Sequence, residues 1–366
     1  MSKIFTSLGL MSGTSLDGID LAIVKTDGET LVERGPSATL AYSAEQQAKL
    51  RQTLVEGVAI QERRQRPGNL KEIEKLVTDW HAAAVHKFLD KNSITHSNIN
   101  VIGFHGQTII HRPEQHLTVQ LGDGQALANA TGIQVVYDLR AADVAAGGQG
   151  APLVPVYHRA LAKQTPIAFV NIGGVANVTH VAADGHLTAF DTGPGNALIN
   201  DWMESHSGVK FDKGGETAAR GRISVAHLKA ALASEYFTNR PPKSLDRNSF
   251  ANLNFTGLSL EDGAATLTAF TAHSIARAVN WFHEPAKSWV ICGGGRHNAT
   301  LMHMLREILP NVQRAEELGL NGDSMEAEAW AYLAARSLRG LPITFPGTTG
   351  VKAELTGGVL AKPSRP

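Results

Sequence analysis

Residues 168–201 carry the sequence AFVNIGGVANVTHVAADGHLTAFDTGPGNALIND, and this stretch decides the fold. Apolar, β-branched runs over 167–170 and 175–181 lie on either side of the paired glycines Gly173 and Gly174. Runs of this kind around a two-glycine turn predict a β-hairpin. Because the turn has almost no side chain, its backbone N–H groups can approach an anionic ligand closely.

The second half of the same stretch predicts one carboxylate beside a turn. A short strand over 187–190 is expected to deliver Asp191 into a glycine and proline turn over 193–195, with a helix over 197–203 behind it. A phosphate and a base would then lie side by side. The plainer alternative stays open at this point: the glycines only turn a hairpin, and Asp191 caps the helix that begins near Asn196.

A second hairpin of the same kind opens the chain. Strands are expected over 4–11 and 19–24, and the turn between them is rich in small residues. This turn offers phosphate-binding hydroxyl and N–H groups, and a carboxylate for direct or water-mediated contact with Mg²⁺, from Ser12, Gly13, Thr14, Ser15, Asp17 and Gly18. A plain surface turn would be the preferred interpretation if this were the only such hairpin.

Length and composition limit the class of protein. At 366 residues and 39.0 kDa, the chain predicts two domains rather than one core. The balance of 34 basic against 34 acidic residues provides no field that would gather nucleic acid or an anionic membrane, so a small-molecule partner is favoured. The single cysteine, Cys292, excludes an internal disulfide and a thiolate metal cluster, which fits a reducing cytoplasm.

The N-terminus does not predict a signal peptide. Lys3 is followed by apolar residues, but Gly13, Asp17 and Asp20 interrupt the run, and no small-residue cleavage site follows. No apolar run elsewhere is long enough to span a bilayer. We therefore expect a cytoplasmic protein.

The first half of the chain predicts alternating helices and strands. Helices are expected over 45–55 and 70–89 with a solvated basic linker over 61–68, and strands over 101–104 and 133–137. The earlier strand ends in His105, Gly106, Gln107 and Thr108, a polar set where open α/β sheets place ligands. A lone histidine is more often structural, and that interpretation is preferred for His105. The other histidines, such as His111 and His116, have no metal-site spacing.

A nearly uncharged glycine-rich run over 145–155 suggests a crossover, and a domain boundary is expected near residue 140. The second half then predicts a further series of elements: a polar loop over 211–221, helices over 225–233, 260–282, 299–308 and 323–338, a buried strand over 289–292, and a weak strand over 351–355. The basic segment over 240–250 can contact a substrate acid, although a surface loop is the preferred interpretation.

The late strand runs directly into Gly293, Gly294 and Gly295, with Asn298 before the following helix. A strand, three glycines and a helix permit close approach by an adenosine. Two glycine-turn hairpins followed by such an element resemble the superfamily of sugar kinases, heat-shock chaperone ATPases and actin. The motifs GLMSGTSLDGID, GFHGQT, AAGGQGAPLVP, NIGGVANVT, FDTGPGNALIND, GGGRHN and EAEAWAYLA together resemble the anhydro-N-acetylmuramic acid kinases over nearly the whole chain.

The resemblance implies an α/β fold: a two-lobed actin-like ATPase built from duplicated ribonuclease H-like domains, with ATP in the interlobe cleft. The lobes are expected at 1–140, joined by the tail 342–366, and at 141–341. The implied reaction is ATP-dependent phosphorylation of 1,6-anhydro-N-acetylmuramic acid with hydrolytic opening of its anhydro ring, giving N-acetylmuramic acid 6-phosphate in cell-wall recycling. A homodimer is also implied.

The resemblance also assigns residues, with Asp191 as the catalytic base, Glu326 at the sugar and Asp17 at Mg²⁺. The implied contacts to ATP are Ser12, Gly13, Thr14, Ser15, Leu16, Asp17, Gly18, Ile19, Asn171, Gly173, Gly174, Gly293, Gly294, Gly295 and Asn298. The implied contacts to the sugar are His105, Gln107, Gln149, Gly193 and Asn196. Gly214, where an acid is commoner, and the segment at Leu245 and Asp246 depart from the pattern, which puts the substrate-side loop in doubt.

Two other functions stay open from the sequence. One is a simple hydroxyl kinase acting on another hexose or amino sugar, which would not need water to open a bridge. The other is a non-catalytic ATP-dependent regulator, which would not need an acid at Asp191. The chain shows no convincing Ser/His/Asp or Cys/His arrangement, which agrees with a reaction that needs no covalent enzyme nucleophile.

Overall fold

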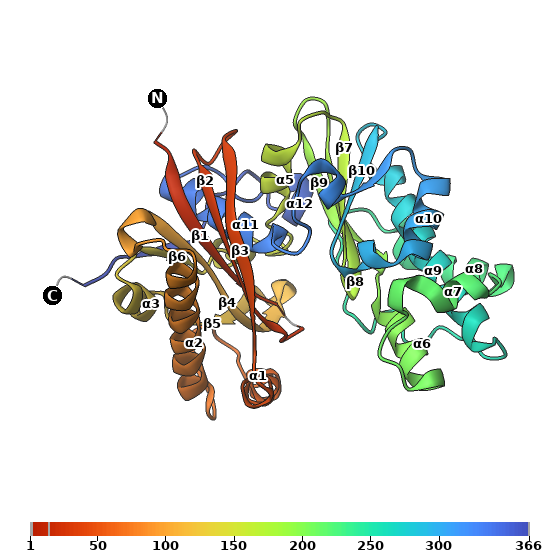
Figure 1. The fold of residues 1–366 in the computed structure, drawn as a ribbon, viewed down its shortest axis with the longest axis horizontal. Helices are drawn as coiled ribbons and strands as arrows, with labels where there is room; N and C mark the ends of the chain where they lie inside the picture. Colours follow the sequence, from red (N-terminus) through yellow and green to blue (C-terminus); the bar gives the residue numbers. More distant parts are fainter. Residues whose placement is uncertain (1–2, 14, 365–366) are drawn as a thin grey trace. The chain divides into compact units, whose positions relative to one another are not determined.

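The computed structural model describes residues 3–13 and 15–364, which form two compact units (Figure 1). Unit 1 comprises Met1–Leu161 and Ser324–Pro366, and unit 2 comprises Ala162–Asp323. Each unit is a mixed α/β structure built on its own sheet, which confirms the α/β class. No described helix combines the length and apolar character needed to cross a membrane.

Unit 1 is built on a sheet that, within the described residues, has seven strands in the order β12-β6-β4-β1-β2-β3, with β5 paired to β4. Strands β1, β2 and β3 form an antiparallel meander, β4 and β6 extend the sheet in parallel from β1, and β12 closes the far edge. The bounds are β1 Phe5–Ser12, β2 Gly18–Thr26, β3 Val32–Ala41, β4 Val101–Arg112, β5 Leu117–Leu121, β6 Val135–Tyr137 and β12 Val359–Ala361.

Alternation along β1 assigns the helices of unit 1 to opposite faces of the sheet. Leu8 and Leu10 point into a core shared with the helices α1 (Ala44–Gly57), α2 (Leu70–Lys91) and α3 (Gly124–Thr131). Between them, Gly9 faces the helix α11 (Met325–Leu338) on the other side. The shorter helices of this unit are α4 Ala141–Ala145, α5 Pro155–Leu161 and α12 Pro346–Thr349.

Helix α11 lies unusually close to the sheet because two glycines face it. Gly9 of β1 and Gly103 of β4 are direct neighbours in the parallel register. A Cβ added at Gly9 would lie 1.8 Å from the carbonyl oxygen of Ala327, and one added at Gly103 would lie 2.1 Å from that of Trp330. The backbone of α11 therefore contacts the strands directly, and this contact sets the distance between the sheet and the helix that carries Glu326.

Unit 2 is built on a five-stranded sheet, counted over its described residues, in the order β11-β10-β7-β8-β9. Strands β7, β8 and β9 form an antiparallel meander, and β10 and β11 run parallel to β7. The bounds are β7 Ile167–Ile172, β8 Val175–Val181, β9 Leu187–Pro194, β10 Ser288–Cys292 and β11 Val312–Arg314, with helices α6 Ala197–Ser207, α7 Glu216–Arg220, α8 Val225–Leu232, α9 Leu260–Ala276 and α10 Ala299–Ile308. Strand β9 is an edge strand.

The chain leaves unit 1 after α5 and returns to it before α11, and a buried carboxylate joins the two places. Glu328 of α11 accepts hydrogen bonds from the hydroxyl of Tyr157 at 2.7 Å and from the hydroxyl of Ser324 at 2.8 Å. Glu328 is 3% exposed, so these two donors satisfy it away from water. Unit 2 is consequently one continuous insertion between two tethered points of unit 1.

Several sequence expectations differ from the structure. The units divide after residues 161 and 323, rather than near 140 and 341, because α11 packs on the first sheet and α5 packs against α11. The expected helix over 260–282 ends as α9 at Ala276 and continues as a 3-10 turn, Arg277–Trp281. The tail forms β12 later than the expected strand over 351–355, where only a bridge between Thr344 and Leu355 occurs.

Other elements have weaker sequence signals. Strand β3 has mostly exposed or half-buried residues and lacks an apolar run, and β5 and α3 are short. The polar loop expected over 211–221 contains the one-turn helix α7. Strand β4 continues past its apolar start to Arg112, so His105 and Gln107 lie inside the strand and not beyond its end.

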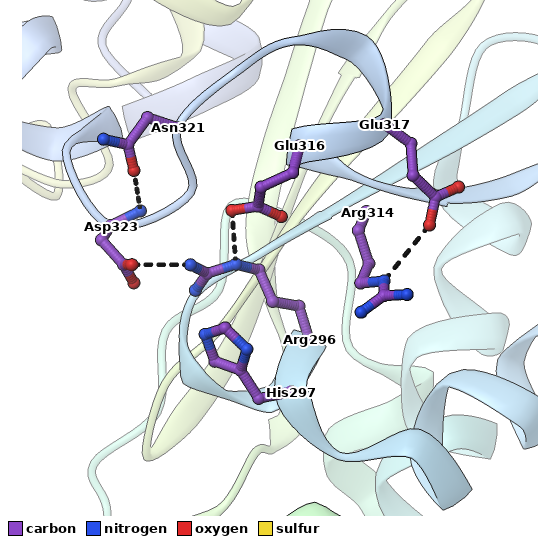
Figure 2. Close-up of a pocket in the computed structure, with 7 residues that line it drawn as sticks. All are labelled: Arg296, His297, Arg314, Glu316, Glu317, Asn321 and Asp323. Atoms are coloured by element: carbon purple, nitrogen blue, oxygen red, sulfur yellow. Dashed lines mark hydrogen bonds and ion pairs between the residues drawn. The ribbon is translucent and has the colours of Figure 1, made fainter.

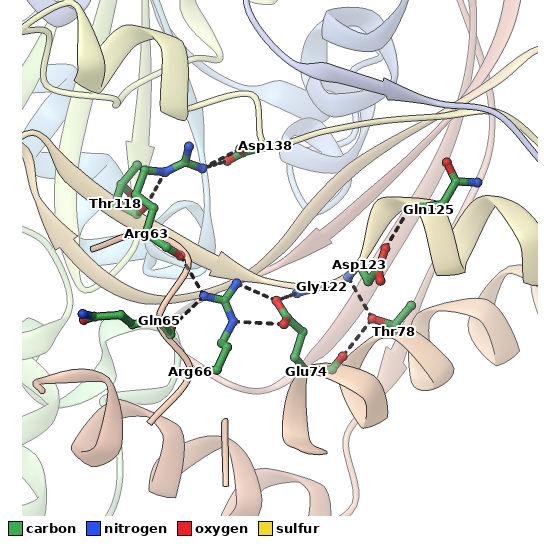
Figure 3. Close-up of polar contacts among 10 residues, drawn as sticks. All are labelled: Arg63, Gln65, Arg66, Glu74, Thr78, Thr118, Gly122, Asp123, Gln125 and Asp138. Carbon is green, nitrogen blue, oxygen red and sulfur yellow. Dashed lines mark hydrogen bonds and ion pairs between the residues drawn. The ribbon is translucent and has the colours of Figure 1, made fainter. Parts of the chain in front are cut away.

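The basic linker over 61–68 is anchored, in contrast to the expected solvated loop (Figure 3). Arg66 forms a two-point ion pair with Glu74 of α2, at 2.9 and 2.7 Å. Arg63 pairs with Asp138, which follows β6 and has a positive φ of 57°. The linker is therefore held on the same edge of unit 1 as β6, because bidentate arginine pairs fix geometry as well as charge.

The contact between α11 and the two glycines generates the first prediction. Gly9→Ala should lower the free energy of unfolding by about 1–3 kcal/mol, because the added methyl group overlaps helix backbone that cannot move aside alone. Urea unfolding followed by circular dichroism measures the change. Gly174→Ala, where an added Cβ would meet nothing nearer than 3.8 Å, is the control and should cost much less. Equal stability of the two variants would contradict the tight contact.

Candidate active site

The first expected phosphate turn lies between β1 and β2 in unit 1. Ser15 and Asp17 are exposed and Gly13 is half-buried, while Thr14 lies outside the described residues. Leu16 adopts a left-handed conformation, φ 60°, and its side chain is 4% exposed in the core. The burial of the Leu16 side chain offsets the cost of that backbone conformation, which is about 1–2 kcal/mol for a residue other than glycine.

The remaining members of the first turn have structural contacts. Gly18 and Ile19 belong to β2, and the side chains of Leu16 and Ile19 are buried in the core and do not face a ligand. A Cβ added at Gly18 would lie 2.5 Å from the carbonyl oxygen of Leu40, which makes glycine necessary there. Ser12 is 1% exposed, and its hydroxyl contacts the hydroxyl of Tyr42 at 2.8 Å.

Gln107 and His105 support this turn from β4. The amide of Gln107 accepts a hydrogen bond from Ser12 at 2.6 Å and donates one to the carbonyl of Gly13 at 3.2 Å. Nδ1 of His105 lies 2.7 Å from the carbonyl of Gly106, and its Nε2 accepts from Arg140 at 3.2 Å. Both side chains are buried, so in this structure they hold neighbouring groups instead of facing a ligand.

A charged cluster next to this turn contains Glu326. Arg140 stacks over the ring of Trp330, 5.2 Å from its centroid, and donates to the carbonyl of Gly150 at 2.7 Å. Burial raises the pKa of the Glu326 carboxyl, the Arg140 charge opposes that rise, and Asp20 adds to it. The proton affinity of the Glu326 carboxylate is therefore set by its burial first, and then by one cation and one neighbouring acid.

Gln149 sits in a loop that one buried acid holds in place. Asp143 is 1% exposed, and it accepts hydrogen bonds from the N–H of Gly150 and from the hydroxyl of Thr349, both at 2.6 Å. The N–H of Gln149 donates to the carbonyl of Thr349 at 2.7 Å. The glycine-rich run expected from the sequence is thus tied to α12, and the side chain of Gln149 is half-buried.

In unit 2, three polar residues form a row across adjacent strands. Asn171 of β7 lies opposite Asn177 of β8, which lies opposite Asp191 of β9. Residues directly opposite one another share a face of the sheet. All three are half-buried. Asp191 belongs to the strand, which continues to Pro194, and not to a turn as the sequence suggested.

The carboxylate of Asp191 is covered by residues 240–250, which we name the covering segment. The N–H of Leu245 donates to Oδ2 of Asp191 at 2.7 Å, and the N–H of Asp191 donates to the carbonyl of Lys243 at 3.0 Å. Burial raises the pKa of the Asp191 carboxyl to about 6, and the Leu245 hydrogen bond acts in the opposite direction. Asp191 is therefore not a helix cap, and the covering segment is not a plain surface loop.

The glycine turn beside this row is open. A Cβ added at Gly173 would meet nothing nearer than 3.6 Å, and one at Gly174 nothing nearer than 3.8 Å. The N–H of Asn196 donates to the carbonyl of Gly173 at 2.7 Å, and its side-chain amide donates to the carbonyl of Ile172 at 3.1 Å. Asn196 thus holds the turn, while Gly193 is buried, with Ser274 2.6 Å from an added Cβ.

The three consecutive glycines lie against the same turn. Gly293 has φ 70°, and a Cβ there would lie 2.3 Å from the side-chain oxygen of Asn171; Gly295 is equally close to Ile172, at 2.4 Å. Gly294 faces the side-chain amide of Asn196, with 3.8 Å to an added Cβ. The two glycine motifs of unit 2, which are far apart in the sequence, are therefore neighbours.

Arg296, which follows the glycine run, contacts two acids, Glu316 and Asp323, as Figure 2 shows. Its guanidinium is 2% exposed and donates to Glu316 at 2.9 Å, to Asp323 at 2.7 Å and to the carbonyl of Gly293 at 2.8 Å. Asn298 is 8% exposed and caps α10 by accepting from the N–H of Leu301 at 2.9 Å. The side chain of Asn298 is occupied by this cap.

Sequence reasoning missed several residues of the site. Asn177 has a readable signal, because the predicted hairpin itself places it opposite Asn171. Arg140 has a weaker one, as a charged residue soon after a strand. Tyr236 and Lys243 have none, since they come to Asp191 through tertiary packing alone. Across the described part of the chain, no group of three or more His, Cys, Asp or Glu residues could hold a metal ion.

Comparisons with known proteins point to one family. A family model for anhydro-N-acetylmuramic acid kinase matches residues 5–363. The anhydro-N-acetylmuramic acid kinase of Methylobacterium nodulans is 54% identical over 98% of this chain and 100% of its own length. The anhydro-N-acetylmuramic acid kinase of Agrobacterium fabrum is 50% identical over 99% of this chain and 100% of its own length.

Solved structures with a similar arrangement are distant in sequence. Component A of the (R)-2-hydroxyglutaryl-CoA dehydratase of Acidaminococcus fermentans has a TM-score of 0.49 at 14% identity, covering 92% of this chain and 99% of its own. A ROK family glucokinase from Streptomyces griseus, in complex with glucose and AMPPNP, has a TM-score of 0.42 at 12% identity. The match covers 90% of this chain and 99% of the glucokinase chain.

Proposed function

The chain belongs to the anhydro-N-acetylmuramic acid kinase family, and we propose how its residues carry out that kinase reaction. ATP phosphorylates 1,6-anhydro-N-acetylmuramic acid while water opens the anhydro bridge, giving N-acetylmuramic acid 6-phosphate and ADP. The observation that supports this best is Asp191: a half-buried carboxylate of raised pKa, in one polar row with Asn171, beside an open glycine turn.

Asp191 is the general base of the proposed reaction. A water molecule loses a proton to its carboxylate and forms the new bond to the anomeric carbon. The bond from that carbon to the bridging oxygen breaks, and this oxygen takes the γ-phosphoryl group as ADP leaves. A carboxylate with a pKa near 6 is ionised at neutral pH but more basic than an ordinary aspartate, which suits this task.

The other residues of the site bind and orient in this proposal. The open turns at Gly13 and Gly174 offer backbone N–H groups to the phosphates, whereas the N–H of Gly173 donates to the carbonyl of Val175. The run Gly293–Gly295 provides a surface without side chains for the adenosine. Glu326 contacts the sugar, with its charge balanced by Arg140. Asn196 and Gln107 keep the turns in shape.

Three finer points are part of the proposal and rest on the resemblance and the composition. The exposed carboxylate of Asp17 fits a Mg²⁺ ion, which usually takes one or two carboxylates together with phosphate oxygens. When bound, Mg²⁺ would neutralise charge on the transferring phosphoryl group. The protein acts as a homodimer, and its location is the cytoplasm, in line with its single cysteine, the buried Cys292.

The reaction itself is tested by its products. With ATP and the anhydro sugar, purified protein should release ADP, and one heavy oxygen from labelled water should appear at the anomeric position of the sugar phosphate. Mass spectrometry measures the label. A panel of hexoses without a bridge is the control and should support little ADP release. Phosphorylated sugar that lacks the label would contradict bridge opening and favour a simple hydroxyl kinase.

Asp191→Asn tests the base. The amide keeps the size of the side chain but cannot accept a proton, so turnover should fall at least about a hundredfold. Binding of ATP, measured by calorimetry, should stay close to that of the wild type, because the turn at Gly173 is intact. Asp184→Asn, at an exposed loop position, is the matched control and should keep full activity. Full activity of Asp191→Asn would remove this residue from the mechanism.

The pH dependence follows from the raised pKa. Only the ionised carboxylate of Asp191 can accept the proton, so kcat/KM should be level above the pKa and should fall as pH drops through about 6. Below that point the fall should approach about tenfold per pH unit. Initial rates between pH 4.5 and 8 measure the profile. A level profile down to pH 4.5 would show that an ordinary, solvated carboxylate or another group limits the reaction.

A further inference from the structure

Lys243 is enclosed in a way unusual for a lysine. Its ammonium group lies 4.5 Å from the ring centroid of Tyr236, 5.4 Å from that of Trp281 and 5.6 Å from that of Phe190. It also donates a hydrogen bond to the carbonyl of Tyr236 at 2.9 Å. Three aromatic faces around one cation attract it through the negative charge of their π-systems, and the attraction is stronger where the cation is shielded from water.

This enclosure fixes the part of the covering segment that contacts Asp191. The carbonyl of Lys243 accepts the N–H of Asp191 at 3.0 Å, and two residues later the N–H of Leu245 reaches the Asp191 carboxylate at 2.7 Å. The hydroxyl of Tyr236 donates to the carbonyl of Asp191 at 2.5 Å. The Lys243 ammonium group is thus connected to Asp191 by the backbone contacts of residues 243 and 245 and by the ring of Tyr236.

The rest of the segment has an anchor of its own. Phe250 packs against Phe237 and Phe270, with ring centroids 5.8 and 5.5 Å away, and Leu245 packs on the same cluster. At its other end the segment follows η4 (Glu235–Thr238) through Pro241 and Pro242, and the side chain of Lys243 anchors it there. The side chain of Lys243 is therefore the anchor nearest to the catalytic carboxylate.

We propose that Lys243 is a positioning residue, which clamps the covering segment on Asp191 so that the Leu245 N–H orients the carboxylate and bulk water, other than the reacting molecule, is kept from it. This inference rests on the proposed role of Asp191 as the base. Lys243 contacts no reacting atom in the proposed reaction. The groups that face Asp191 are Tyr236 from η4, Lys243 from the covering segment and the uncharged Asn177 from β8.

The direction of the pH effect can be worked out. Burial raises the pKa of Asp191, the Leu245 hydrogen bond lowers it, and burial is the larger effect. When the segment loosens, water reaches the carboxylate and both effects weaken. Because the larger one weakens too, the pKa falls toward the ordinary aspartate range. The base then becomes weaker and loses its fixed orientation, so turnover falls while the acidic limb of the profile moves to lower pH.

The test compares Lys243→Met with Lys243→Arg. Methionine keeps an apolar stem of similar length but has no charge or donor, and arginine keeps both. Lys243→Met should lower kcat about 10- to 100-fold, with KM for ATP changed less than about twofold, and should move the acidic limb of kcat/KM below its wild-type position. Lys243→Arg should restore most of the rate. Lys229→Met, at an exposed position of α8, should leave all values unchanged.

A double variant separates this inference from the proposed function. In an Asp191→Asn background, Lys243→Met should cause little further loss, because both changes act on one group. Full activity of Asp191→Asn would overturn the proposed base itself. If Asp191→Asn is inactive but Lys243→Met keeps the wild-type rate and pH profile, only the proposed role of Lys243 is overturned. Equal losses of activity in Lys243→Met and Lys243→Arg would overturn it as well.

A second variant covers the case in which Lys243→Met does not fold. Tyr236→Phe keeps the ring below the ammonium group but removes the hydroxyl that donates to Asp191. It should lower kcat less than Lys243→Met and move the acidic limb in the same direction. An unchanged limb and rate in folded Tyr236→Phe, shown by a wild-type melting temperature, would contradict the link between the covering segment and the base.

Discussion

The partial removal of one carboxylate from water is the constraint on which the site in unit 2 depends. Asp191 lies on an edge strand, where an acid would ordinarily be solvated, and the covering segment closes that edge with a backbone N–H on the carboxylate. Burial raises the pKa of Asp191 and hydrogen bonding lowers it. The result is a base that is ionised at neutral pH but binds a proton more tightly than an ordinary aspartate does.

Several polar residues in the motifs bind neighbouring protein groups and so hold the turns of the site in shape. Gln107 bonds to both Ser12 and the first turn, and His105 is an acceptor for Arg140. Asn298 caps a helix, and Arg296 holds the glycine run through two acids. This division of labour follows from geometry: turns that must approach a ligand closely have no side chains, so neighbouring elements must fix their shape.

The sequence predicted the α/β class, both hairpins, the long helices and the family, because apolar periodicity and glycine turns are local signals. It did not predict β3, whose residues are largely exposed, or the position of Asp191 inside β9, since a strand that ends in Thr, Gly and Pro has no apolar pattern there. The contact of Leu245 with Asp191 joins residues 54 apart in the sequence and depends on packing of Phe250 and Lys243, which no local pattern encodes.

The insertion of unit 2 between Leu161 and Ser324 makes unit 1 discontinuous, and this affects the order of events during synthesis. A ribosome releases residues 162–323 as one complete unit before it makes α11 and β12, the last pieces of the first sheet and its cover. The nascent first unit therefore exposes the bare groove over Gly9 and Gly103 throughout that interval. The inserted unit can finish folding first, and its partner closes only when the final forty-three residues, 324–366, emerge from the exit tunnel.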